Sequence, residues 1–137
     1  GNGNGGGHYA DSCLRAYWLT GDKGYLDTAS LNADFQLGAN PLSKTFITGL
    51  GTRPPIQPQI NKSLYKEPRK TGATVKGITP YGLGGSKPPG FPVDVPPYRC
   101  WRDIGESAEN NSEFTITETV GCSAMLYATL YAEELSR

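Results

Sequence analysis

A proline- and glycine-rich stretch of about seventy residues separates the helical segments of this chain and constrains its fold most strongly. Between residues 41 and 112 little periodicity is visible, and proline pairs interrupt the chain at positions 54–55, 88–89 and 96–97. Loops of this length are uncommon in compact domains unless they carry function or are disordered. The aromatic residues within the stretch predict a loop that packs on something: Phe46, Tyr65, Tyr81, Phe91, Tyr98 and Trp101.

Two helices are predicted before this stretch, joined as a helical hairpin. Asp22 is a suitable N-cap for the second helix, and Gly38 and Pro41 supply its end. Both helices show apolar residues at helical spacing. In the first these are Tyr9, Ala10, Cys13, Leu14, Tyr17 and Trp18, and in the second Leu26, Ala29, Ala33 and Leu37, widened by Tyr25.

A third helix is predicted after the stretch. Thr115 and Glu118 have the spacing of a capping box, which places the helix start near Thr115. Its expected apolar face is Val120, Ala124, Tyr127, Tyr131 and Leu135. Three helices flanking so long a loop cannot easily enclose a core. We therefore expect residues 1–137 to form one partial domain of a larger helical protein, or to associate with themselves as a homo-oligomer.

The charge is balanced overall but divided along the chain. The sequence has 13 Lys and Arg against 13 Asp and Glu, yet residues 44–102 hold ten basic residues against Glu67 and Asp94. This basic loop could meet an anionic polymer, or it could be a solvated loop that faces acidic neighbours, which we prefer. A neutral total argues against nucleic acid as a partner. No apolar run approaches the roughly 20 residues of a membrane span, so no membrane partner is expected.

Cysteine and histidine offer little chemistry. The single His8 cannot form a zinc site with scattered cysteines, and no motif supports a catalytic triad, so we expect it to be packed locally. No metal or other cofactor is predicted. One disulfide with an odd thiol is possible, but buried free thiols are the preferred interpretation of Cys13, Cys100 and Cys122.

An acidic cluster is the strongest chemical signal in the residues themselves. Asp103, Glu106, Glu109 and Glu113 follow Trp101 closely. Like charges raise one another's pKa when partly buried, and a carboxyl held protonated near neutrality can donate a proton to a leaving oxygen. Beside aromatics, this is how the acid of a glycosidase is built. The alternative, which the residues alone favour, is a solvated acidic turn before a helix.

Four stretches carry a family resemblance through their order and spacing. They are residues 5–9 (GGGHY), 19–27 (LTGDKGYLD), 38–55 (GANPLSKTFITGLGTRPP) and 111–113 (NSE). The third is similar to an LGxNPxxxSFVTGxG signature with its following prolines. Together they resemble the C-terminal part of the catalytic domain of glycoside hydrolase family nine, a family of inverting cellulases and endoglucanases.

The resemblance implies a mainly α fold: the C-terminal fragment of an (α/α)6 toroid, with three main helices and a long irregular active-site loop. It implies Glu113 as the proton donor. It also suggests Trp101, Tyr98 and Tyr9 as residues that stack on sugars. Asp103 is a further candidate for binding substrate, and together with Glu106 and Glu109 it would tune the pKa of the acid. The implied partners are a polysaccharide or oligosaccharide substrate and the remainder of the catalytic domain. The family also implies secretion or a periplasmic location, although no signal segment opens the chain.

Several departures from the family pattern leave a second function open. The Asp-x-x-Asp pair that supplies the family's catalytic base does not occur in this sequence. Residues 57–60 read QPQI where the family carries a histidine, Ser112 replaces an asparagine, and Glu109 stands where an aromatic is common. The fragment alone should therefore not turn over substrate. The alternative is a glycan-binding module or inactive relative, for which the basic loop suggests an anionic glycan.

Overall fold

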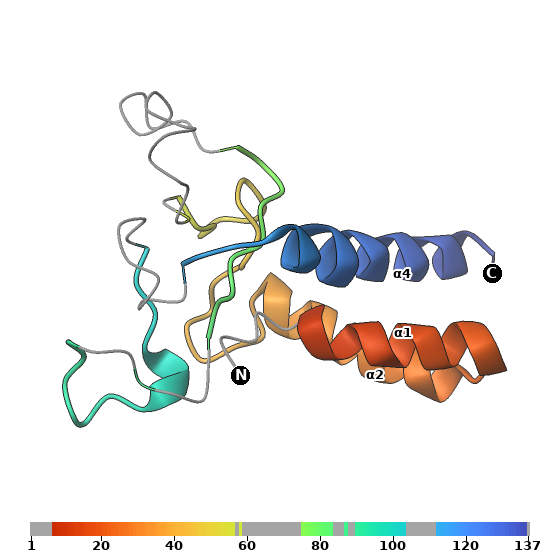
Figure 1. The fold of residues 1–137 in the computed structure, drawn as a ribbon, viewed down its shortest axis with the longest axis horizontal. Helices are drawn as coiled ribbons and strands as arrows, with labels where there is room; N and C mark the ends of the chain where they lie inside the picture. Colours follow the sequence, from red (N-terminus) through yellow and green to blue (C-terminus); the bar gives the residue numbers. More distant parts are fainter. Residues whose placement is uncertain are drawn as a thin grey trace.

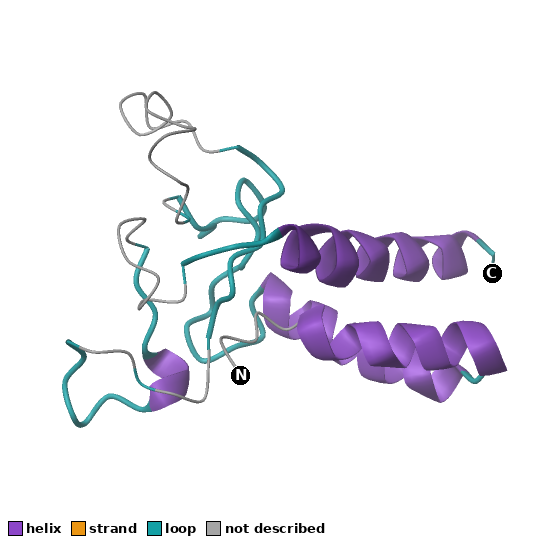
Figure 2. Ribbon diagram, viewed as in Figure 1, coloured by secondary structure: helices purple, strands orange, loops and turns teal. Residues whose placement is uncertain are grey.

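Three long helices lie side by side, and the loops gather at one end of them (Figures 1 and 2). This computed structural model describes residues 7–56, 58, 75–83, 87, 90–103 and 112–136. The fold is mainly α, as predicted, and the described residues form no β-strand. The first two long helices are α1 (Gly7–Thr20) and α2 (Lys23–Leu37). The last long helix consists of the π-helical η3 (Thr117–Ala124) followed by α4 (Met125–Leu135). A short 3-10 turn, η1, spans Pro97–Arg99.

The hairpin of α1 and α2 begins and ends where the sequence predicts. The Asp22 side chain caps α2 by accepting a hydrogen bond from the Gly24 N–H at 2.9 Å. Gly21 turns the chain with φ of 71°, and Gly38 ends α2 with φ of 136°, both in the region that favours glycine. Local capping chemistry therefore fixes both ends of α2.

Replacing Asp22 with Ala is expected to lower the free energy of unfolding by about 1 kcal/mol, because the Gly24 N–H loses its acceptor. Urea unfolding followed by circular dichroism measures the change. Asp94→Ala, in an exposed loop, removes the same carboxylate without touching a helix end. Equal losses in the two variants would contradict the capping role.

The helices share one apolar core. Its buried members are Ala10, Leu14, Leu26, Ala29, Ala33 and Leu126, and Cys13, Tyr17, Tyr127 and Leu130 pack against it. The stripes predicted on α1 and α2 are thus confirmed in their central positions. At the edges of the stripes the prediction of burial was wrong, because Tyr9, Trp18 and Leu37 are 60%, 50% and 41% exposed.

The last helix confirms its predicted start but only one position of its predicted face. The Thr115 N–H donates to the Glu118 carboxylate at 3.2 Å, which is one half of a capping box, and the Thr115 hydroxyl accepts from the Thr117 N–H at 3.2 Å. Of the expected face, Tyr127 does pack against the helical core, whereas Val120, Tyr131 and Leu135 are exposed and the buried positions are Cys122, Ser123 and Leu126. A π-helix spaces its hydrogen bonds i to i+5, so η3 rotates its residues away from the positions that an α-helical period assigns.

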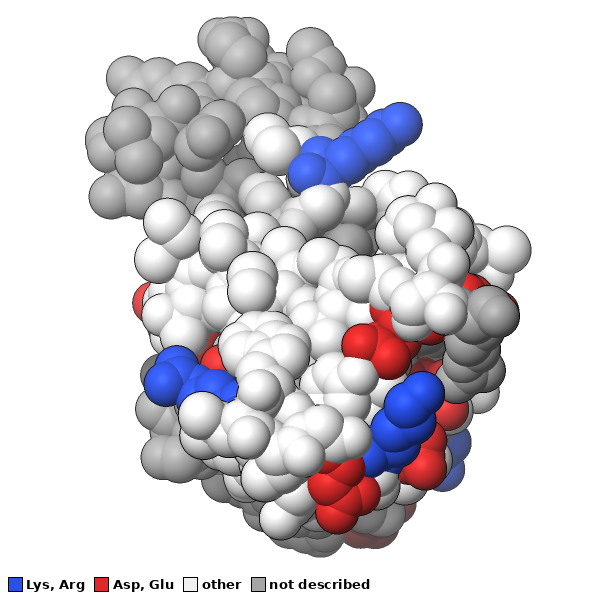
Figure 3. Space-filling view, turned by 90° about the vertical axis from the view of Figure 1, so that its right-hand side faces the viewer, with Lys and Arg blue, Asp and Glu red and all other residues white. Residues whose placement is uncertain are grey.

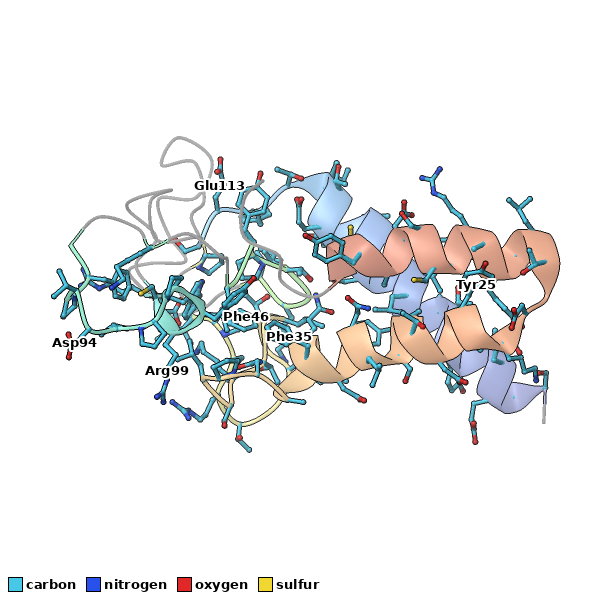
Figure 4. All side chains as sticks on the ribbon, turned by 90° about the horizontal axis from the view of Figure 1, so that it is seen from below. Tyr25, Phe35, Phe46, Asp94, Arg99 and Glu113 are labelled. Atoms are coloured by element: carbon cyan, nitrogen blue, oxygen red, sulfur yellow. The ribbon has the colours of Figure 1, made fainter. Side chains whose placement is uncertain are left out.

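Part of the irregular stretch that the structure describes is packed, as predicted, through two of its aromatic residues, Phe46 and Trp101. A second cluster of buried residues consists of Phe46, Leu83 and Trp101, with Phe35 and Leu42 packed against it. Phe35 belongs to α2, so this loop cluster continues directly from the helices. Figure 4 shows Phe35 and Phe46 near one another, with Tyr25 at the opposite end of α2.

The cysteines are free thiols, as preferred from the sequence. Cys100 and Cys122 are buried and Cys13 is half-buried. Within the described part of the chain, no helix is both long enough and apolar enough to cross a membrane.

Candidate functional site

The loop after α2 is fixed by Asn40. Its amide nitrogen donates to the carbonyl oxygens of Phe35 and Lys44, each at 2.7 Å, and its side-chain oxygen accepts from the Leu42 N–H at 3.1 Å. An asparagine before a proline commonly organises a turn through such side-chain bonds to the backbone. The Asn-Pro pair of the signature thus sets the direction of the chain into the loop cluster.

Thr48 joins this loop to a segment almost thirty residues further along the chain. Its hydroxyl donates to the Val75 carbonyl at 2.6 Å, and its N–H donates to the Ile78 carbonyl at 2.9 Å. Gly49 follows with φ of 74°, and a Cβ there would lie 2.6 Å from Cγ of Lys76. The Thr-Gly pair of the signature is therefore explained by a close crossing of two backbone segments.

A buried polar group connects these loops to the helices. Gln36 is fully buried on α2, and its side-chain nitrogen donates to the Ser123 hydroxyl at 2.9 Å. Its side-chain oxygen accepts from the Tyr127 hydroxyl at 2.6 Å, and the Thr79 hydroxyl bonds Ser123 at 2.9 Å. Burial of Tyr127 raises the pKa of its phenol. Gln36 thus holds α2, η3, α4 and the 75–83 segment in one arrangement.

Replacing Gln36 with Leu is expected to lower the free energy of unfolding by about 1–3 kcal/mol, because buried hydroxyls of Ser123 and Tyr127 lose a partner. Chemical denaturation measures the loss. Asp27→Leu makes a polar-to-apolar change at an exposed position of the same helix. A Gln36→Leu variant as stable as Asp27→Leu would show that the polar group contributes no net stability.

Glu113 lies where the loops meet the last helix. It is half-buried, and its carbonyl oxygen accepts a hydrogen bond from the Tyr81 N–H at 2.8 Å. Figure 4 shows it at the loop-bearing end of the helices. Burial, followed by the charges of Glu118 and Glu113, raises the pKa of the Tyr81 phenol. The Glu118 carboxylate is engaged in the capping box with Thr115, so Glu113 is the better candidate for chemistry.

Trp101 and Asp103 lie together inside the loop cluster. Trp101 is only 9% exposed and packs edge-to-face on Phe46, with ring centroids 5.4 Å apart. The Lys44 ammonium lies 5.1 Å from the centroid of the Trp101 ring. An Asp103 carboxylate oxygen accepts from the Ile56 N–H at 2.7 Å. These contacts hold both residues in the packed interior of the loop cluster. A sugar-binding role for either residue stays a prediction.

The two tyrosines predicted to stack on sugars are both exposed and belong to different elements. Tyr98 is 53% exposed in η1, and Tyr9 is 60% exposed in the first turn of α1. In Figure 4, η1 is marked by Arg99 and lies on the other side of the loops from Glu113. Both rings have the exposure that stacking needs, and their role also stays a prediction.

Other predicted residues fall partly outside the described structure. Glu106, Glu109, Tyr65 and most of residues 57–60 are not described, nor is the side chain of His8. The acidic cluster is therefore represented by Asp103 and Glu113. In the described part of the chain, no group of three or more His, Cys, Asp or Glu side chains is placed to hold a metal ion.

Several basic side chains of the basic loop form hydrogen bonds to the backbone of the loop itself. Lys44 donates to the Pro54 carbonyl and Arg53 to the Leu42 carbonyl, at 2.9 and 3.3 Å. Farther along, Lys87 and Arg102 bond backbone carbonyls in the same way. Figure 3 looks onto the helix end of the molecule, opposite the loops of Figure 1, and on that face basic and acidic side chains are interspersed. These bonds give several basic side chains a role within the loop that needs no anionic ligand.

Sequence reasoning missed Gln36 and Lys44 as organising residues. Gln36 gave a weak signal, since it is a polar residue inside the apolar stripe of a predicted helix. Lys44 gave none, because a lysine in a loop normally indicates a solvated position.

Comparison with known structures relates this arrangement to an enzyme. The crystal structure of a metagenome-derived glycoside hydrolase family 9 endoglucanase matches this chain with a TM-score of 0.55 and 29% sequence identity. The match covers 72% of this chain and 17% of that enzyme, so this chain spans a small part of the enzyme's length. No family model matches the sequence, and a search of curated proteins finds no significant match. The helical fold of this chain is similar to part of a glycoside hydrolase and agrees with the expected fragment of an (α/α)6 toroid.

Proposed function

We propose that this chain supplies the general-acid side of a site that hydrolyses β-linked glycans, with Glu113 as the proton donor. The observation that carries the proposal is the position of Glu113. It is half-buried at the junction of the loops and the last helix, in a fold similar to part of an endoglucanase. The Tyr81 hydrogen bond holds the backbone at this residue. A glycan is accordingly the expected partner, and export from the cell is the expected location.

An inverting reaction needs two carboxyl groups. The acid protonates the glycosidic oxygen while a base activates water on the opposite face of the sugar, and the two groups lie about 6.5–9.5 Å apart. Glu113 has the first role in this proposal. The base is an aspartate from the rest of a larger catalytic domain, because the aspartates of this chain lack the Asp-x-x-Asp spacing. The chain alone should then not turn over substrate.

The experiment measures reducing-end release by the complete catalytic domain on a panel of neutral and acidic β-linked glycans. We expect release from at least one neutral β-glucan, with the product formed in the inverted anomeric configuration. Release with retained configuration would contradict the two-carboxyl inverting arrangement. No release from any member of the panel would contradict hydrolysis.

A second candidate is a glycan-binding module without catalysis. The sequence QPQI at residues 57–60 favours it, since the family's histidine is a usual substrate ligand. Binding of a glycan by the complete domain without any cleavage would support this function. Retention on an acidic glycan that weakens with salt, and is weaker on a neutral glucan, would identify the ligand as anionic.

A further inference from the structure

The side chain of Lys44 reaches three separate groups. Its ammonium donates to the Pro54 carbonyl at 2.9 Å, lies 3.9 Å from an Asp103 carboxylate oxygen, and lies 5.1 Å from the centroid of the Trp101 ring. Lys44 follows the Asn40 turn directly, while Trp101 and Asp103 come nearly sixty residues later. One cation therefore links two distant loop segments.

This link is formed away from bulk water. The side chains of Lys44 and Asp103 are only 15% and 19% exposed. An ion pair at this depth is screened less than a surface pair, and breaking one partner leaves a poorly solvated charge. Burial lowers the pKa of Lys44, the Arg53 charge acts in the same direction, and Asp103 opposes them. The ion pair with Asp103 is thus one of the interactions that favour the charged lysine in this position.

The geometry also restricts Trp101. The Lys44 cation approaches the indole ring, and Phe46 packs on the indole edge-to-face with an interplanar angle of 86°. Asp103 is held in turn, because its carboxylate accepts the Ile56 N–H. Residues 101–103 are therefore fixed against residues 44–56 by a cation, an aromatic contact and a backbone hydrogen bond.

We propose that Lys44 is a positioning residue that locks Trp101 and Asp103 against the loop of residues 41–56. Trp101 and Asp103 are also the residues predicted to bind substrate, so the lock would set their position for a glycan. The effect on catalysis rests on the function proposed above, whereas the effect on Trp101 does not. Lys44 touches no reacting atom in this account and acts through Trp101 and Asp103.

Fluorescence of Trp101 tests the lock directly. The chain has two tryptophans, and Trp18 is half-exposed on α1, so a Trp18→Phe background isolates Trp101. In that background Lys44→Met should raise acrylamide quenching about twofold, because Met keeps the aliphatic stem but removes the cation above the ring. Lys44→Arg should restore most of the protection. Lys23→Met, on the exposed first turn of α2, is the matched control.

Two further variants and an activity measurement complete the test. Asp103→Asn keeps the side-chain volume but removes the charge that pairs with Lys44, so it should also raise quenching of Trp101. This variant replaces Lys44→Met in the test if Lys44→Met loses its helical circular dichroism. In the complete catalytic domain, Lys44→Met should raise KM about tenfold and change kcat by less than about threefold. Quenching equal to that of Lys23→Met in both variants would overturn the inference. Increased quenching in a protein that hydrolyses no glycan would support the lock and contradict only the proposed function.

Discussion

Replacing Glu113 with Gln is expected to lower kcat on unactivated β-glucans by about a hundredfold to ten-thousandfold, the range that general acids contribute. Gln keeps the size of the side chain but cannot transfer a proton to the leaving oxygen. The backbone bond from Tyr81 to the Glu113 carbonyl does not depend on the side chain, so the fold should remain intact. Initial rates of reducing-end release by the complete catalytic domain measure the effect.

Glu134→Gln is the matched control for this prediction. It makes the same chemical change at an exposed position near the end of α4, far along the chain from the loops. Its kcat should equal that of the unchanged protein. If Glu113→Gln retained activity within about threefold of this control, Glu113 would not be the general acid.

The largest stability loss is expected for Phe46→Ala, at about 3–5 kcal/mol in the free energy of unfolding. Phe46 is fully buried and packs with Leu83 and the Trp101 ring in the loop cluster. The truncation leaves a cavity between Leu83 and Trp101, which come from segments far apart in the sequence. Small domains are stable by only about 5–15 kcal/mol, so the variant should lose much of its stability. Equilibrium unfolding in urea measures the loss.

Val93→Ala provides the comparison for Phe46→Ala. Val93 is 97% exposed, so its truncation should change the free energy of unfolding by less than about 0.5 kcal/mol. If both variants lost the same small amount, the loop cluster would contribute no core, and the packing of the irregular stretch would be contradicted.

The helices were predictable to the extent that local chemistry determines them. Asp22, Gly38 and the Thr115–Glu118 box mark helix ends through side-chain or backbone bonds that span a few residues, and all three are confirmed. The buried face of the last helix was not predictable in this way. Its π-helical start has a different period from an α-helix, so different residues face the core, and no local sequence signal predicts that change of period.

The candidate site was predictable only through its signatures. Trp101 and Asp103 were predicted to contact substrate, which stays a prediction, and the structure places them in a packed cluster with Phe46 and Lys44. Irregular segments carry no periodicity that separates inward from outward side chains, so the sequence cannot say which aromatic is core. Gln36 was missed for a related reason, because its partners come from segments far away in the chain.

The dependence of the Glu113→Gln defect on the leaving group tests the central claim most directly. Rates would be measured for the complete catalytic domain and its Glu113→Gln variant on aryl β-glycosides of decreasing phenol pKa, beside an unactivated β-glucan. A general acid is needed less as the leaving oxygen becomes less basic, so the defect should shrink steadily and nearly vanish for the most acidic phenol. A defect of the same size on every substrate would contradict proton donation by Glu113 and assign it a structural role.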